Sequence, residues 1–110
     1  MKNLRGLIGA VVIGRNEGVR LRGCLISLSA VVDCIVYVDS GSTDDSLSIA
    51  AECGVAIVSL DTSITFSAGR ARNVGFDHLI NLHPDLQFVQ FVDGDCELQS
   101  EWIEAGFEQL

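Results

Sequence analysis

The sequence predicts an α/β fold, in which helices cover both faces of a mostly parallel sheet in three α/β/α layers. Short apolar runs rich in Val and Ile alternate with segments in which apolar residues recur at helical spacing. The chain has 110 residues, of which 48% are hydrophobic, enough for a single well-filled core. No linker, internal repeat or low-complexity stretch divides it. We therefore expect one domain over residues 1–110.

The first two strands and the helix between them are expected in the first third of the chain. Residues 7–13 form a continuous apolar run, and residues 34–38 form a second one that ends abruptly at Asp39. Between these strands we expect an amphipathic helix over residues 19–30. Its apolar stripe consists of Leu21, Cys24, Leu25 and Leu28.

Turn-forming residues then lead into a second helix. Ser42 or Thr43 can cap this helix, and the two aspartates that follow suit the positive end of its dipole. Gly54 is expected to end it. The residues expected on its buried face are Leu47, Ala50 and Ala51.

The same alternation continues to the end of the chain. We expect a third strand over residues 55–60 and, after a loop, a helix that Ser67 caps and that runs to about residue 82. A fourth strand over residues 86–92 and a last helix capped by Ser100 follow. This order predicts a Rossmann-like parallel sheet with right-handed crossovers. In such sheets ligands bind beyond the carboxyl ends of the strands.

Charged and hydrogen-bonding residues follow three of the four predicted strands. Arg15, Asn16 and Glu17 come after the first, Asp39 after the second, and an Asp-Gly-Asp sequence at residues 93–95 after the fourth. Any one of them suits a solvated turn or a helix cap. Their convergence on one rim of the sheet favours a functional site.

The Asp-Gly-Asp sequence is the most specific of these features. Asp93 and Asp95 lie one residue apart, and two carboxylates this close repel each other unless they share a divalent cation. Mg²⁺ or Mn²⁺ keeps coordination positions open for phosphate, so the pair can anchor a metal–diphosphate. Gly94 lets the backbone turn tightly and approach a ligand.

The charge balance excludes one class of partner. The net charge of −8 argues against a nucleic-acid partner, which requires a basic surface. An anionic nucleotide would also be repelled by clustered carboxylates, unless a divalent cation lies between them. Arg70 and Arg72 are two of only seven basic residues, and Arg72 suits ligand contact and plain surface charge equally well. His78 and His83 have no partner at metal-ligand spacing, so we assign them no role.

The remaining signals concern the cell compartment. The four cysteines lie in or beside apolar runs without a C-x-x-C pair, which favours reduced, structural thiols over a disulfide or metal role. The short apolar run at the N-terminus does not have the length or cleavage site of a signal peptide. No segment approaches the roughly 20 apolar residues of a membrane span. We therefore expect a cytoplasmic chain.

Four blocks of sequence, in this order and spacing, resemble the opening half of family-2 glycosyltransferases. They read VVIGRNEGVRLRGCLISL, IVYVDSGSTDDSLSIA, FSAGRARNVGF and FVQFVDGDCEL, and they span the chain from about Ile8 to the last predicted helix. The resemblance implies the N-terminal half of the A-type glycosyltransferase fold. It also implies metal-dependent transfer of a sugar from a nucleotide-diphosphate donor, usually UDP-linked, to an acceptor.

The resemblance also implies roles for residues at the first two strand ends. Asn16 and Glu17 match the Asn-Glu pair that lines the nucleotide pocket of the family. Asp39 matches the acidic residue that hydrogen-bonds the base. Ser40 departs from the commonest form of the second block, which has a second Asp there, but Asp-Ser-Gly-Ser is a frequent variant.

Further matches concern the diphosphate and the metal. Arg72 and Asn73 match an Arg-Asn pair that faces the nucleotide. Asp93 matches the D-x-D residue near the ribose and metal, and Asp95 matches the main ligand of Mn²⁺ or Mg²⁺. The metal would neutralise the diphosphate as the glycosidic bond breaks.

No residue of the chain matches the family's catalytic base, so none is assigned as catalytic. Family members continue beyond this length, with the acceptor pocket and the base in the later part. The chain is therefore expected to be either a portion truncated relative to the family or a natural short protein that completes its sheet by association. Its last strand would be an edge that can pair with a second copy, which predicts a homodimer.

Four other functions compete with the transferase. A non-catalytic nucleotide-binding module would have the same pocket. A sugar-nucleotide-forming nucleotidyltransferase would place a Gly-rich basic loop where this chain has Gly-Arg-Asn-Glu. A phospho-acceptor domain would need an acidic pair after the first strand and a late Lys, and a dinucleotide-binding domain would need G-x-G-x-x-G. The sequence disfavours the last three.

Overall fold

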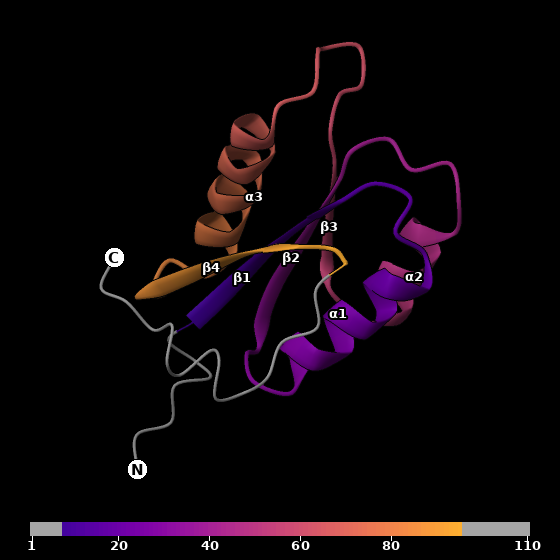
Figure 1. The fold of residues 1–110 in the computed structure, drawn as a ribbon. Helices are drawn as coiled ribbons and strands as arrows, with labels where there is room; N and C mark the ends of the chain where they lie inside the picture. Colours follow the sequence, from indigo (N-terminus) through magenta and orange to yellow (C-terminus); the bar gives the residue numbers. More distant parts are fainter. Residues whose placement is uncertain (1–7, 96–110) are drawn as a thin grey trace.

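The computed structural model describes residues 8–95 and shows strands and helices in strict alternation (Figure 1). The predicted helix after Ser100 lies outside the described residues. The elements, in chain order, are β1 (Ile8–Gly14), α1 (Val19–Ser29), β2 (Cys34–Asp39), α2 (Ser46–Glu52), β3 (Ala56–Ser59), α3 (Ala68–Leu82) and β4 (Phe88–Asp93).

The four strands form one parallel sheet in the order β3-β2-β1-β4, as the alternation predicted. The central strand β1 is apolar and buried along most of its length because it has a neighbour on each side. The register pairs Gly14 with Asp39 on β2 and Ile13 with Asp93 on β4. Two of the predicted site residues therefore lie one on each side of the end of β1.

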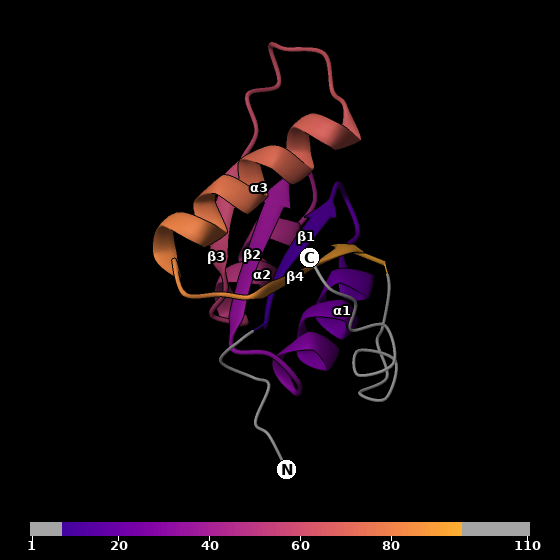
Figure 2. The ribbon, with the colours of Figure 1, turned by 90° about the vertical axis from the view of Figure 1, so that its left-hand side faces the viewer.

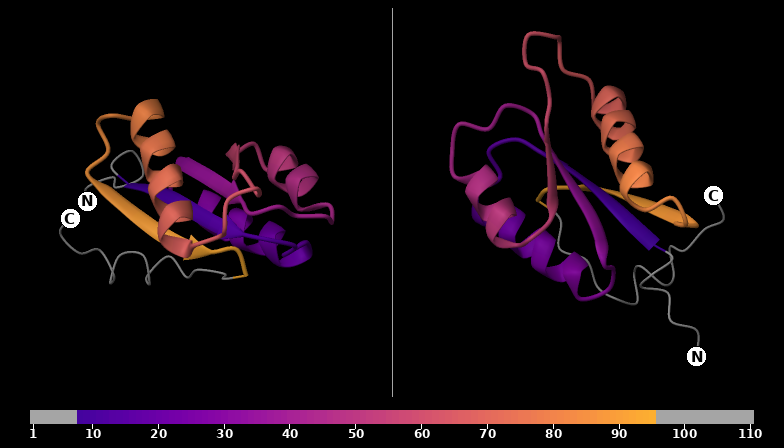
Figure 3. Two further views of the ribbon diagram at one scale, coloured as in Figure 1. Left: turned by 90° about the horizontal axis from the view of Figure 1, so that it is seen from above. Right: turned by 180° about the vertical axis from the view of Figure 1, so that it is seen from behind.

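Helices cover both faces of the sheet and complete three layers. Helices α1 and α2 pack together on one face, and α3 crosses the other (Figures 1, 2 and 3). Alternate side chains of β1 enter different cores: Val12 packs with α1 and α2, whereas Val11 packs with α3. The predicted α/β/α architecture is confirmed.

The predicted stripe of the first helix is confirmed, but that of α2 is partly wrong. Leu47 is 37% exposed and Ala51 is also exposed, whereas Ile49 and Ala50 are buried. The reason is the start of the helix. The N-cap is Asp45 and not Ser42 or Thr43, so α2 begins later and has only seven residues.

Helix α3 follows the sequence prediction closely. The Ser67 side chain accepts a hydrogen bond from the backbone N–H of Arg70, as expected of an N-cap. The helix buries Ala71, Gly75 and Leu79 against the sheet. Its start, beside the carboxyl ends of the strands, faces the rim where the predicted site residues gather (Figure 1).

Candidate functional site

The candidate site is the rim formed by the carboxyl ends of the parallel strands. The loops after β1, β2 and β3, the Asp-Gly-Asp turn after β4 and the start of α3 all lie at this rim. The predicted convergence is confirmed in its outline, because the parallel sheet brings these strand ends to one side. The residues at this rim belong to the loops after β1 and β2, to the lining of a cavity, or to the Asp-Gly-Asp turn.

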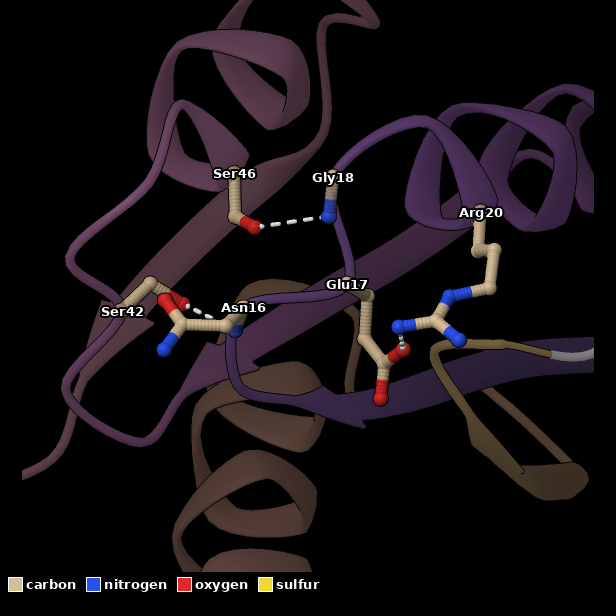
Figure 4. A network of polar contacts seen from close by, with 6 residues as sticks. All are labelled: Asn16, Glu17, Gly18, Arg20, Ser42 and Ser46. Atoms are coloured by element: carbon tan, nitrogen blue, oxygen red, sulfur yellow. Dashed lines mark hydrogen bonds and ion pairs between the residues drawn. The ribbon is translucent and has the colours of Figure 1, made fainter.

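Asn16 ties the loop after β1 to the loop after β2. Its backbone lies in the left-handed region with φ of 55°, and its side-chain Oδ1 accepts hydrogen bonds from the backbone N–H groups of Thr43 (2.7 Å) and Asp44 (3.2 Å). Its own N–H donates to the hydroxyl of Ser42 at 2.9 Å (Figure 4). Asn is one of the few residues that tolerate this conformation. The side-chain oxygen thus holds a loop.

The start of α2 is fixed to the same loop. The N–H of Gly18 donates to the hydroxyl of Ser46 at 3.1 Å (Figure 4). The N–H of Ser46 donates to the carboxylate of Asp44 at 2.9 Å. The hydrogen bonds from the Ser46 side chain and backbone lower the pKa of Asp44 below its ordinary value. The loops after β1 and β2 therefore form one connected unit.

Asp39, predicted to contact the base, is buried with only 2% of its surface exposed. One carboxylate oxygen accepts from the hydroxyls of Tyr37 (2.7 Å) and Ser42 (2.5 Å), and the other accepts from the N–H groups of Gly41 (3.1 Å) and Ser42 (2.9 Å). Four donors fill the acceptor capacity of a carboxylate. Burial, and then the hydrogen bond to Asp39, raise the pKa of Tyr37 above its ordinary value. Asp39 therefore shapes the loop after β2.

A cavity of about 410 Å³ opens beside this loop. It lies between the ends of β1 and β2, the loop that follows β3 and the start of α3. Its size suits a nucleoside-sized ligand. The lining residues are Arg15, Ser40, Gly41, Ser42, Leu60, Asp61, Thr62, Ile64, Thr65, Phe66 and Arg70.

The arginine that lines this cavity is Arg70. Its guanidinium donates to the backbone carbonyl of Asp61 at 3.4 Å. The hydrogen bonds from Ser63, and then the charge of Arg70, lower the pKa of Asp61. The predicted pair Arg72 and Asn73 is exposed on α3 and is not part of the cavity lining.

The arginines of the described part fall into two groups. Arg20 and Arg22 form ion pairs with Glu17 (3.1 Å) and Glu52 (3.4 Å). Arg15, Arg70 and Arg72 form no ion pair with a carboxylate of residues 8–95, and two of them line the cavity. The cavity therefore has two arginines that can pair with an anionic ligand, beside the carboxylate of Asp61.

The Asp-Gly-Asp turn presents two carboxylates to solvent. Asp93 and Asp95 are exposed, whereas Gly94 between them is buried and donates its N–H to the carbonyl of Ile13 at 2.8 Å. These oxygens fit a hard divalent cation, which is held in many sites by one or two carboxylates together with substrate phosphates. Within residues 8–95, no three His, Cys, Asp or Glu side chains gather into a metal-binding group.

Sequence reasoning missed the cavity-lining loop. Residues 61–66 carry no motif, and only the folded chain shows that Ile64 and Phe66 lie beside Arg70. The unpaired arginines offered a partial signal, since Arg15 is a cation directly after a buried strand. As for membranes, no helix within residues 8–95 has the length and apolarity to span one.

Comparison with known proteins gives a family and a fold. A model described as Glycosyl transferase family 2 matches residues 10–110. An uncharacterized glycosyltransferase of Rickettsia conorii is 37% identical over 57 residues, which are 52% of this chain and 20% of that protein. A second one, from Rickettsia felis, is 37% identical over 51 residues, 46% of this chain and 18% of that protein. The chain thus spans about a fifth of the length of these relatives.

Solved structures show the same fold. Glucosyl-3-phosphoglycerate synthase from Mycobacterium tuberculosis, in complex with Mn²⁺, UDP and glucosyl-3-phosphoglycerate, gives a TM-score of 0.67 at 24% identity. The match covers 88% of this chain and 37% of that one. The complex of the same enzyme with UDP gives a TM-score of 0.62 at 26% identity, over 84% of this chain and 34% of the other.

Proposed function

The chain belongs to glycosyl transferase family 2, and from this premise we propose that it holds the nucleotide part of a sugar donor for transfer to an acceptor. The donor would be a nucleotide-diphosphate sugar of the UDP type. The observation that carries the proposal is the arrangement of the rim. A nucleoside-sized cavity at the ends of β1 and β2 is separated by the end of β1 from two exposed carboxylates, one at the end of β4 and one in the turn after it.

This arrangement suits the parts of a nucleoside diphosphate. The base and ribose would occupy the cavity of about 410 Å³, where Arg15 and Arg70 offer hydrogen-bond donors and planar stacking surfaces. The diphosphate would extend past the end of β1 toward the turn after β4. Arg72 and Asn73, exposed on the first turns of α3, remain our candidates for contact with this part of the donor.

Asp93 and Asp95 would hold Mn²⁺ or Mg²⁺ against the diphosphate. The solved relatives contain Mn²⁺ together with UDP, and the two carboxylates here provide the oxygen ligands that such ions prefer. The bound cation would neutralise the charge that develops on the diphosphate leaving group. The other residues of this chain would orient the bound nucleotide. Asn16 and Asp39 would hold the two loops that frame the cavity, and Asp39 would act through Ser42 more than by direct contact with the base.

A non-catalytic nucleotide-binding module remains the second candidate, because it would use the same rim. The two differ in product formation. Incubation with several sugar nucleotides and Mn²⁺, followed by measurement of released nucleoside diphosphate, separates them: release supports transfer or hydrolysis, and binding without release supports the module. The acceptor is not assigned by any residue of the described part.

The first test is calorimetric titration with UDP, with and without Mn²⁺, on the parent chain and on Asp95→Ala. We expect Mn²⁺ to strengthen UDP binding at least tenfold, and Asp95→Ala to remove that gain, because the cation loses a carboxylate ligand. Asp85→Ala is the matched control, since it removes an exposed carboxylate before the opposite end of β4. UDP binding that is equal with and without Mn²⁺ in a folded chain would contradict the proposal.

A further inference from the structure

We propose that Glu17 is a positioning residue that holds the Asp-Gly-Asp turn against the end of β1 and couples metal binding to nucleotide binding. The inference rests on the proposed function, since it assumes that Asp93 and Asp95 bind the cation. It assigns Glu17 a role that differs from lining the nucleotide pocket. Glu17 is not among the residues that line the cavity, and its side chain lies on the side of β4.

The aliphatic part of Glu17 fills the space between two glycines. A Cβ atom built on Gly14 would lie 3.2 Å from Cγ of Glu17, and one built on Gly94 would lie 3.3 Å from the same atom. Gly14 ends β1 and Gly94 is the centre of the Asp-Gly-Asp turn. Since neither glycine has a side chain, the Glu17 methylene packs directly between their backbones. The aliphatic stem of Glu17 thus provides the packing between the end of β1 and the Asp-Gly-Asp turn.

The carboxylate of Glu17 is paired with Arg20. The two side chains form an ion pair at 3.1 Å, and the backbone N–H of Arg20 donates to the Glu17 carbonyl at 3.0 Å (Figure 4). The Glu17 side chain is 22% exposed, whereas that of Arg20 is 64% exposed. An ion pair this exposed contributes little to stability, so we assign the positioning to the aliphatic stem of Glu17.

The backbone of the turn is anchored from the same side. The N–H of Gly94 donates to the carbonyl of Ile13 at 2.8 Å, and the thiol of the buried Cys24 lies 3.7 Å from the carbonyl of Asp93. A Cβ built on Gly94 would also lie 3.5 Å from Cδ1 of Leu21. The contacts with β1 and α1 therefore hold the backbone of the turn, while its two carboxylates stay exposed.

Asn16, the residue before Glu17, reaches in the other direction. Its side chain holds the loop after β2, which borders the cavity, while the stem of Glu17 contacts the turn after β4. Because these residues are adjacent, a shift of either loop is transmitted to the other through one peptide unit. The geometry therefore links the cavity to the metal-binding turn, and two linked sites have a coupling free energy.

The test compares variants that keep or remove the stem. Glu17→Ala removes it, Glu17→Gln keeps it without the charge, and Glu17→Asp shortens it by one methylene. Glu52→Ala is the matched control, because it breaks the ion pair with Arg22, and Glu52 is not among the atoms that would meet a Cβ built on Gly94. Two quantities are measured on the full 110-residue chain: hydrogen exchange at the Gly94 amide without ligand, and the ratio of UDP affinities with and without Mn²⁺.

We expect Glu17→Ala to accelerate Gly94 exchange and to lower the affinity ratio, each by about tenfold, whereas Glu17→Gln and Glu52→Ala stay within about twofold of the parent. Should Glu17→Ala not fold, Glu17→Asp is expected to change both quantities in the same direction. Rescue by Gln separates positioning from metal ligation, since a ligand carboxylate would be lost in Gln as well.

Two results would overturn the inference. One is Gly94 exchange and an affinity ratio that do not change in Glu17→Ala and Glu17→Asp. The other is a Glu17→Gln variant as impaired as Glu17→Ala, which would make the carboxylate itself a ligand. Failure of the proposed function looks different: UDP binding by the parent chain would be absent or would not depend on Mn²⁺. Gly94 exchange would then decide alone whether Glu17 positions the turn.

Discussion

At the scale of residues, Ser40 and Ser42 have opposite hydrogen-bonding states although they lie two positions apart. Ser42 donates to Asp39 through its hydroxyl and its N–H, and accepts from the N–H of Asn16. The hydroxyl oxygen of Ser40 is buried and has no hydrogen-bond partner among the described residues. An unsatisfied buried hydroxyl costs free energy, whereas a satisfied one supports its neighbours.

This contrast gives the first prediction. Ser42→Ala should lower the free energy of unfolding by about 2 kcal/mol, because it removes a hydroxyl donor from the buried carboxylate of Asp39. Ser40→Ala should leave it unchanged or raise it by up to about 1 kcal/mol. Urea unfolding followed by circular dichroism measures both. Equal destabilisation by the two variants would show that the network around Asp39 is not what holds this loop.

Tyr37 provides a second prediction, on pH. Its side chain is fully buried and hydrogen-bonded to Asp39, so its pKa is raised above the ordinary value of 10.0. As pH rises past about 10, the unfolded chain ionises first and binds fewer protons than the folded chain, so stability falls with rising pH. Since the chain has a single tyrosine, tyrosinate absorbance reports on this group alone.

We expect the folded chain to develop tyrosinate absorbance at a higher pH than the chain in urea. Unfolding titrations between about pH 9 and pH 11 should show decreasing stability, and Tyr37→Phe should remove the part of the decrease that follows tyrosine ionisation. Tyrosinate that appears at the same pH in folded and unfolded chains would contradict the buried hydrogen bond.

The residue scale also shows what sequence could and could not predict of the site. Asn16, Glu17, Asp39, Asp93 and Asp95 were correctly placed at strand ends, because a parallel sheet brings these positions to one rim. Which groups still have donors or acceptors to offer a ligand could not be predicted. That depends on whether partners such as Ser42 and Tyr37 already satisfy them, and the partners of Asp39 are set by the loop conformation.

At the scale of elements, the two long helices were predictable from the sequence, and the register of the short helix α2 was not. Helices α1 and α3 bury one face each against the sheet. The helix predicted over residues 19–30 ends one residue earlier, and the helix predicted from the Ser67 cap to about residue 82 has these bounds. Helix α2 has seven residues, too few for its pattern to determine its register. The backbone N–H groups of Thr43 and Asp44 donate to Oδ1 of Asn16, so these two residues are held in the loop that precedes the helix.

Helix α3 gives the third prediction, from two glycines on one helix. A Cβ built on Gly75 would lie 2.4 Å from Cγ1 of Val11 and 2.7 Å from Cγ2 of Val38, whereas one built on Gly69 meets nothing within 4 Å. Gly75→Ala should therefore destabilise the fold by about 1–3 kcal/mol through overpacking. Gly69→Ala should stabilise it by roughly 0.5 kcal/mol through helix propensity.

Thermal and urea unfolding of the two variants test this pair. Helix propensity alone predicts stabilisation in both, so the sign of the Gly75→Ala change decides whether close approach of α3 to β1 and β2 controls the layer spacing. A stabilised Gly75→Ala variant would mean that α3 can move away from the sheet at little cost.

At the scale of the whole molecule, the sheet has two edges of unequal kind. Strand β3 has four residues, whereas β4 has six and, within the described residues, pairs only with β1. Phe91 on β4 is 39% exposed. An edge strand with an exposed aromatic side chain can pair with another chain, whereas a net charge of −8 opposes association by repulsion.

These two effects lead to the last prediction, that the 110-residue chain self-associates through β4 at high concentration and more strongly at high salt. Salt screens the repulsion between acidic copies but leaves strand pairing and apolar contact in place.

Sedimentation velocity over a range of concentrations at two ionic strengths measures the effect. Phe91→Lys should weaken association by placing a charge on the edge strand, whereas Ile26→Lys, at a 58% exposed position on α1, should not. A chain that stays monomeric at the highest concentration and salt would show that this edge does not recruit a second copy. Both substitutions make the net charge of −8 less negative by one and so reduce repulsion equally, which means that a weakening found only in Phe91→Lys reports on β4 itself. Equal weakening by both variants would contradict a contact through β4.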